Sequence, residues 1–294
     1  MSLLTDTQGS PERVWSALAG VTTFGELSRA ELESLLNPGF LKAGLDPVKT
    51  VNIRQVIGAA SSLGALKVDR TSAATNLQTA TPTQVEMADW THDVLCSLEP
   101  EHKDAVILET YAWLVARSDQ DGSMAWMHEM NADAFADAAV EGLVGVDDDG
   151  DVKMNKSKVV AWRRWLVFLG LATPLPSPLL PQPSPATRLR RELVRAGMAG
   201  ATLGGQEFLS VVAERLPYLD RGRLFLQACE RLGRLPSSQR LSPMLSIALR
   251  DLEDDGSLKL TQLGDASGII QLAEDPTHLT KGFLSVQVAA DAAQ

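Results

Sequence analysis

The sequence predicts a mainly α-helical protein with small β-hairpin wings, organised as tandem winged helix-turn-helix modules. The chain is rich in alanine and leucine while only 5% of its residues are aromatic, which favours helices over a β-sandwich or barrel. A local pattern of helix, stop signal and short alternating strand also occurs three times along the 294 residues. A hydrophobic fraction of 45% with 22% charged residues excludes global disorder.

The first segment, residues 1–78, is expected to form one module. Three helices are predicted from apolar spacing and end signals: residues 11–20, 29–36 and 52–63. Ser28 is placed to cap the second of these helices, and Glu31 stands in the capping-box position. Gly64 ends the third helix, and a short strand that opens the wing follows it.

The second segment, residues 79–173, is expected to be helical and to end in a second winged-helix-like module. Its last helix covers residues 157–169 and stops at Gly170. Trp162, Trp165 and Phe168 recur at three-residue steps, which predicts that they form a core face.

Residues 174–185 contain six prolines in twelve positions. Proline cannot continue a helix and supplies no backbone N–H, so we expect an extended, polyproline-like linker. The stretch includes a PxxP pattern that could dock into an aromatic groove. A plain linker is the preferred interpretation because such short matches are common.

The third segment, residues 186–294, is expected to form the C-terminal winged-helix module. Helices are predicted over residues 206–216 and 221–232, followed by a helix that Ser242 caps and Gly256 ends. Residues 258–260 and 268–272 are the expected wing strands. The alternative for the whole chain is an irregular helical protein with three incidental helix-to-strand corners.

The net charge of −10 hides a strong asymmetry. Residues 1–152 hold 9 Lys and Arg against 24 Asp and Glu, whereas residues 153–294 hold 18 against 13. A globally acidic protein binds nucleic acid poorly by charge alone, but a local basic face can contact phosphates or an acidic partner. Between Val152 and Arg191 there are eight basic residues and no acidic one.

The candidate nucleic-acid contacts follow from the way a helix-turn-helix protein binds DNA, with basic side chains on the third helix and on the wing. They are Lys156, Lys158, Arg163, Arg164, Arg54, Lys67, Arg188, Arg190 and Arg191. The second module carries the strongest cationic face, for which nucleic-acid contact, partner docking and a solvated face all remain open. The third helix is acidic after Arg250, so its role in a DNA groove is doubtful.

The sequence gives no sign of catalysis or of a metal site. It has no P-loop, no G-x-S-x-G elbow and no H-E-x-x-H motif. The acidic run 147–151 lacks the glycine and the final carboxylate of an EF-hand and is interpreted as a solvated turn. The four histidines lie far apart, and Cys96 and Cys229 are expected to be core thiols. We therefore expect no enzyme activity, no metal and no cofactor.

The third segment resembles the DpdG proteins. The resemblance rests on Phe208-Leu209, on Leu216 to Gly222, on Leu241 to Ser246 and on Asp251 to Gly256. The turn from Trp165 to Leu171 and the opening Met1-Ser2-Leu3-Leu4 are compatible with it. Those proteins are encoded in bacterial islands that install and exploit 7-deazaguanine bases in DNA for phage defence. The family offers no catalytic residues to carry over.

This resemblance implies a non-enzymatic DNA-binding or adaptor subunit of a DNA-modification or defence complex. Its expected partners are double-stranded DNA and proteins from the same operon. The alternative is a scaffold for a partner ATPase or helicase that does not contact DNA. Neither a secretory signal nor a membrane span is expected, so the predicted location is cytoplasmic.

Overall fold

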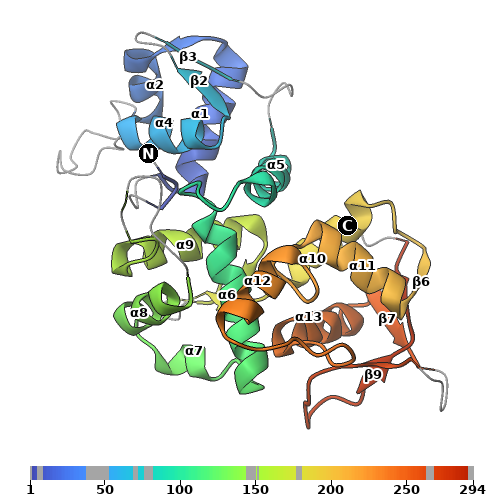
Figure 1. Ribbon diagram of the computed structural model, residues 1–294. Coiled ribbons are helices and arrows are strands. Elements are labelled where there is room, and N and C mark those ends of the chain that lie inside the picture. The colour runs from blue at the N-terminus through green and yellow to red at the C-terminus, as the bar shows by residue number, and fades with distance from the viewer. Residues whose placement is uncertain are drawn as a thin grey trace.

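A computed structural model describes residues 2–4, 9–37, 53–68, 72–75, 82–143, 150, 152–176, 181–262 and 268–290. The protein is mainly helical with small antiparallel sheets, as the sequence predicts (Figure 1). Its N-terminal elements, blue in Figure 1, gather at the top of the view, above the remaining helices. The predicted acidic turn lies outside the described residues, apart from Gly150.

The N-terminal part contains three helices and a three-stranded sheet. Its elements are α1 (Pro11–Phe24), β1 (Leu27–Ser28), α2 (Arg29–Leu36), α4 (Ile53–Ser62), β2 (Leu66–Val68) and β3 (Ser72–Thr75). Strand β3 lies between β1 and β2 and is antiparallel to both. Ser28 and Glu31 form the predicted capping box of α2, and Gly64 follows α4 with a φ of 72°, a left-handed conformation that suits glycine.

Polar contacts fasten the N-terminal part to the middle of the chain. The Asp104 carboxylate accepts hydrogen bonds from the Leu3 amide, at 2.7 Å, and from the Ser62 hydroxyl. The Trp15 indole donates to the Pro82 carbonyl at 2.8 Å. These bonds supplement the packing of α1 against α9 (Lys156–Leu169) of the middle part.

The middle part is built around one long helix, α6. Its elements are α5 (Gln84–Ser97), α6 (Val106–Asp121), α7 (Trp126–Glu129), α8 (Ala132–Gly142), α9 (Lys156–Leu169) and β4 (Ala172–Thr173). Helix α6 is buried on nearly all sides because α5 and α8 pack against it, as do two helices of the C-terminal part. Trp162 of α9 is buried as predicted, and its indole donates to the Ile107 carbonyl of α6 at 3.0 Å. Gly170 ends α9 with a φ of 76°.

In the proline-rich stretch, Gln182 and Pro183 pair with the strand that follows α9, which differs from the extended spacer expected from composition, and residues 177–180 lie outside the described residues. Strand β5 (Gln182–Pro183) pairs antiparallel with β4, and the Ser184 amide donates to the Leu171 carbonyl at 3.0 Å. Proline is tolerated in this strand because it lies at an edge, where a missing N–H leaves no ladder bond unmade. Within the described residues the expected second module has this two-stranded sheet but no third strand.

The C-terminal part repeats the strand order of the N-terminal part. Its elements are α10 (Ala186–Arg195), β6 (Thr202–Gly204), α11 (Gly205–Arg215), α12 (Arg223–Arg231), α13 (Pro243–Asp254), β7 (Leu258–Thr261), β8 (Ile270–Gln271), β9 (Gly282–Phe283) and β10 (Ser285–Val288). Strand β10 lies between β6 and β7, as β3 lies between β1 and β2. Ser242 caps α13 as predicted, and its hydroxyl accepts from the Leu245 amide.

The expected pairing of strands 258–260 and 268–272 is wrong. Strand β7 pairs with β10, and β8 pairs with β9. The register explains the choice, because it sets Leu258 opposite Val288 and Leu260 opposite Val286, so that four buried aliphatic side chains share one face.

The two parts with the same strand order differ in how their last helix is covered. Helix α13 packs against α6, α10 and β7, and nearly all its side chains up to Leu252 are buried, with Ile247 and Asp251 the exceptions. Helix α4 keeps one face at the surface. The core that covers α13 is continuous with that of the middle part.

Candidate functional site

The exposed face of α4 is the first candidate for an interface with a partner. Ile53, Val56 and Ile57 are buried against the N-terminal core, whereas Arg54 is exposed. Gly58 and Ser61 follow Arg54 at helical spacing and are also at least partly exposed. The helix contains no acidic residue.

The strand that follows α4 adds a second cation. Lys67 lies on β2 with its side chain exposed. Arg54 and Lys67 therefore both lie at the surface, on the two elements where the sequence places them. Arg54 is the one charged residue of α4, and a lysine-bearing strand follows the helix, so these two elements are suited to approach an anionic polymer.

The basic face of α9 is largely engaged by its own neighbours. The Lys156 ammonium lies 2.7 Å from a carboxylate oxygen of Asp133, and Lys158 donates to the Val152 carbonyl at 2.8 Å. The Arg163 guanidinium packs over the Phe135 ring, 5.9 Å from its centroid, and burial lowers the pKa of this arginine. Arg164 is exposed. Lys156 and Arg164 are thus the α9 cations most accessible to a partner.

Arg188 corrects the sequence prediction, because its side chain is fully buried. Its Nε donates to the Leu169 carbonyl at 2.6 Å, and its Nη1 lies 2.5 Å from Asp89 and 3.3 Å from Glu192. A guanidinium held in this way cannot reach a duplex. Arg190 and Arg191 are partly exposed, and Arg191 lies 3.8 Å from the same Asp89 carboxylate.

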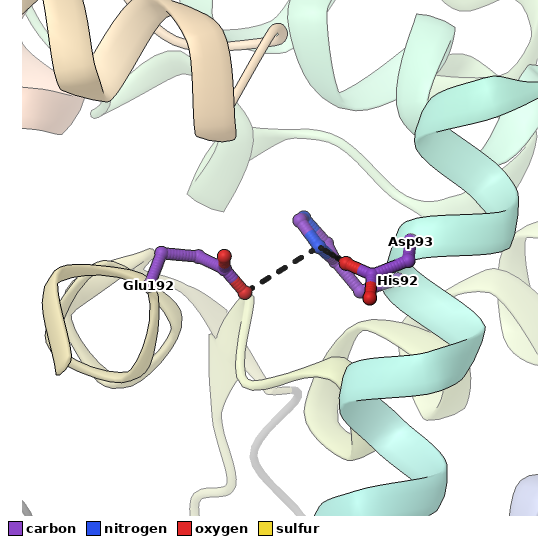
Figure 2. Close-up of side chains that lie close together, drawn as sticks. All are labelled: His92, Asp93 and Glu192. Carbon is purple, nitrogen blue, oxygen red and sulfur yellow. Dashed lines mark ion pairs between the residues drawn. The ribbon is translucent and has the colours of Figure 1, made fainter. Parts of the chain in front are cut away.

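Arg188 belongs to a polar cluster between α5 and α10 that includes three residues of metal-ligand type. Figure 2 shows His92 and Asp93 of α5 facing Glu192 of α10. The His92 Nδ1 atom lies 3.7 Å from Glu192 and 3.9 Å from Asp93, and one ligand atom from each residue fits within 4.8 Å of the others. The His92 Nε2 atom is 3.0 Å from the Tyr218 hydroxyl.

The cluster's electrostatics favour a structural role over metal binding. The Arg195 guanidinium donates hydrogen bonds to the Glu192 carboxylate at 2.6 Å and to the Asp93 carboxylate at 3.0 Å. Burial raises the pKa of Asp93, but its hydrogen bonds with His92 and Arg195 outweigh burial and hold this pKa below its ordinary value. Burial lowers the pKa of His92, so the imidazole is neutral near pH 7. A metal ion would have to displace the arginines that neutralise these carboxylates.

Sequence reasoning missed this cluster because its members are about 100 positions apart. The available signal was local and incomplete: His92, Asp93 and Cys96 share one helix at close spacing, and Arg188, Glu192 and Arg195 share another. Nothing in the sequence indicated that the two helices meet.

The fold and these surfaces together define a mainly helical protein with small antiparallel sheets and two separate groups of accessible cations, one on α4 and β2 and one on α9. No helix within the described ranges combines the length and apolarity that crossing a bilayer requires. The chain belongs to the DpdG-like family, whose model matches residues 1–266. This membership connects it with DpdG-related systems of DNA modification and defence. No curated protein and no solved structure matches the chain.

Proposed function

We propose that this protein is a non-enzymatic DNA-binding or adaptor subunit of a DNA-modification or defence complex, and that its N-terminal part is the DNA-contacting winged-helix module. Within the described residues the order is strand, helix, helix, strand, strand, with the last strand in the centre of the sheet, and this order supports the proposal because it is typical of a winged helix. In such a module α4 is the recognition helix, and β2 and β3 form the wing.

The observation that carries this proposal is that Arg54 and Ser61 of α4 are exposed among the residues that the structure describes. Arg54 stands on this helix with small and uncharged neighbours, which lets the helix approach the major groove closely. Lys67 on the wing strand is placed to pair with a backbone phosphate. The C-terminal part shares the strand order, but its α13 is covered by α6 and acts as a structural element.

The test compares two lysines at equivalent positions. Lys67 lies on the strand after α4, and the exposed Lys259 lies on the strand after α13. Fluorescence anisotropy with a labelled duplex at several salt concentrations would measure affinity and its salt dependence. We expect Arg54→Ala with Lys67→Ala to weaken binding and to reduce the slope of log K against log salt by about 1–2, because each phosphate contact contributes about 0.9.

The Lys259→Ala variant should bind the duplex as the unmodified protein does. An unchanged salt slope in the Arg54 and Lys67 double variant would remove α4 from the interface. Replacement of Lys156, Lys158, Arg163 and Arg164 by alanine tests the α9 face in the same assay. If duplex affinity falls in that variant but not in the Arg54 and Lys67 double variant, DNA contact would be assigned to α9 instead.

A second candidate function is a scaffold for a partner ATPase or helicase without DNA contact. It is favoured by the acidic end of α13, where Asp251, Asp254 and Asp255 are exposed together. These three carboxylates repel DNA phosphates and would attract a basic surface of a partner protein. This function predicts no mobility shift with any duplex at near-physiological salt and stable co-purification with the product of a neighbouring gene.

A further inference from the structure

A pocket of about 300 Å³ opens where α6, α7, α8 and α9 meet strand β5. This volume lies at the lower end of the range typical of small-molecule sites. The apolar part of the lining includes Met127, Met130, Leu175, Pro181 and Pro183. Methionine side chains adapt to the shape of an apolar partner, so this wall suits the hydrocarbon part of a ligand.

The lining of the pocket carries a positive charge without a negative one. Arg163 of α9 lines the pocket, and its polar neighbours in the lining are His128 and Gln182. Among the described residues that line the pocket, none is Asp or Glu. This charge balance favours an anionic ligand over a cationic one.

Arg163 also differs from the buried arginine of the same part of the fold. The Arg188 guanidinium is fully buried and lies 2.5 Å from the Asp89 carboxylate. Arg163 is only partly exposed and packs over the Phe135 ring, but within the described part of the chain it forms no ion pair with a carboxylate. Burial lowers the pKa of Arg163, and an anion in the pocket would supply the missing opposite charge.

The single guanidinium narrows the class of anion. The planar fork of an arginine donates two parallel hydrogen bonds to one carboxylate. A phosphate monoester carries a charge of about −1.5 to −2 at pH 7, which one arginine would leave partly unbalanced. A monocarboxylate is therefore the anion that matches Arg163, and the apolar lining requires that it carry a hydrocarbon body.

We propose that this pocket binds a monocarboxylate with an apolar body, whose carboxylate pairs with Arg163 and whose hydrocarbon part lies against the methionine and proline side chains. The ligand can be a free acid or the C-terminal residue of a polypeptide, since both present the same groups. The proposal does not depend on DNA binding by α4.

The experiment measures binding of phenylpropionate to the full chain by isothermal titration calorimetry. The matched ligand is phenylpropionamide, which keeps the ring and loses the charge. We expect the amide to bind about tenfold more weakly, because it forfeits a hydrogen bond between charged groups. Acetate, which has the carboxylate without the apolar body, should also bind at least about tenfold more weakly than phenylpropionate.

Arg163→Gln tests the role of the guanidinium, and Arg164→Gln is the matched control, because Arg164 is the next residue of α9, is exposed and does not line the pocket. We expect Arg163→Gln to bind the acid about tenfold more weakly and the amide as the unmodified protein does. Arg164→Gln should bind both ligands normally. If Arg163→Gln loses both ligands, Arg163→Lys, which keeps the charge, should still prefer the acid, and equal binding of acid and amide by that variant would overturn the proposal.

Two further arms complete the test. Tighter binding of a tripeptide that ends in phenylalanine with a free carboxylate would identify a polypeptide C-terminus as the source, and tighter binding of phenylpropionate would identify a free acid. The Arg54→Ala and Lys67→Ala double variant should bind phenylpropionate normally, so the two proposals can fail separately. Equal binding of acid and amide by the unmodified protein, full affinity for the acid in Arg163→Gln, or no saturable binding at millimolar acid would each overturn the proposal.

Discussion

Replacement of Arg188 by methionine tests whether this arginine is a structural anchor rather than a DNA contact. Methionine keeps an unbranched stem of similar length but removes the charge. The change leaves the Leu169 carbonyl without its 2.6 Å donor and deprives Asp89 and Glu192 of a buried cation. Breaking a buried ion pair costs about 3–5 kcal/mol. We expect a loss near the lower end, about 3 kcal/mol, because Arg195 still neutralises Glu192 at 2.6 Å.

The loss would be measured by urea denaturation followed by tryptophan fluorescence and by thermal melting. At about 2–4 °C for each kcal/mol, the melting temperature should fall by about 6–12 °C. Arg190→Met is the matched control, two positions away and partly exposed, and should stay within about 0.5 kcal/mol of the unmodified protein. Equal stability of the Arg188→Met and Arg190→Met proteins, with weaker duplex binding in the former, would refute the structural assignment.

Two further predictions concern the core and its pH dependence. Gly142→Ala should destabilise the fold by about 1–3 kcal/mol in urea titration, because the added methyl would meet the Trp113 indole at 2.0 Å, while Gly204→Ala, with open space around it, should be far milder. Asp220→Asn should remove a pH-dependent loss of stability. Burial, opposed by hydrogen bonds from Ser242, raises the pKa of Asp220 to about 6. The contribution of Asp220 to the free energy of unfolding is therefore fully present below the pKa of this carboxyl in the unfolded chain, and it is lost as the pH rises through 6. Denaturation from pH 4 to 7 should show the unmodified protein losing about 3 kcal/mol relative to the variant, and parallel curves would contradict the assignment.

Features encoded by adjacent residues were predictable from the sequence. The capping box of Ser28 and Glu31, the cap at Ser242 and the left-handed glycines at positions 64 and 170 occur where local backbone chemistry places them. Each depends on hydrogen bonds or dihedral angles within four residues. The predominance of helix was predictable for the same reason, because helix propensity is a property of individual residues.

Features that depend on distant partners were not predictable. Arg188 stands in a stretch without acidic residues, which suggested an exposed basic surface, but its partner Asp89 lies 99 positions earlier. The proline content of residues 174–185 indicated a spacer. Composition alone cannot show that the Ser184 amide donates a hydrogen bond to the Leu171 carbonyl. Pairing of β7 with β10 likewise depends on a match of buried faces between strands that are separated in the sequence by β8 and β9.

The burial of α13 has a consequence for the size of any DNA site. Helices α6 and α10 pack against α13, and most of its side chains are buried, so under the proposed function α4 rather than α13 would present its face to a duplex. One recognition helix covers one half-site, and repeated half-sites lie about one helical turn, or 34–36 Å, apart. A single chain that binds through α4 would therefore leave a short footprint on one face of the duplex, and protection of a two-fold symmetric site would require a second copy of the protein.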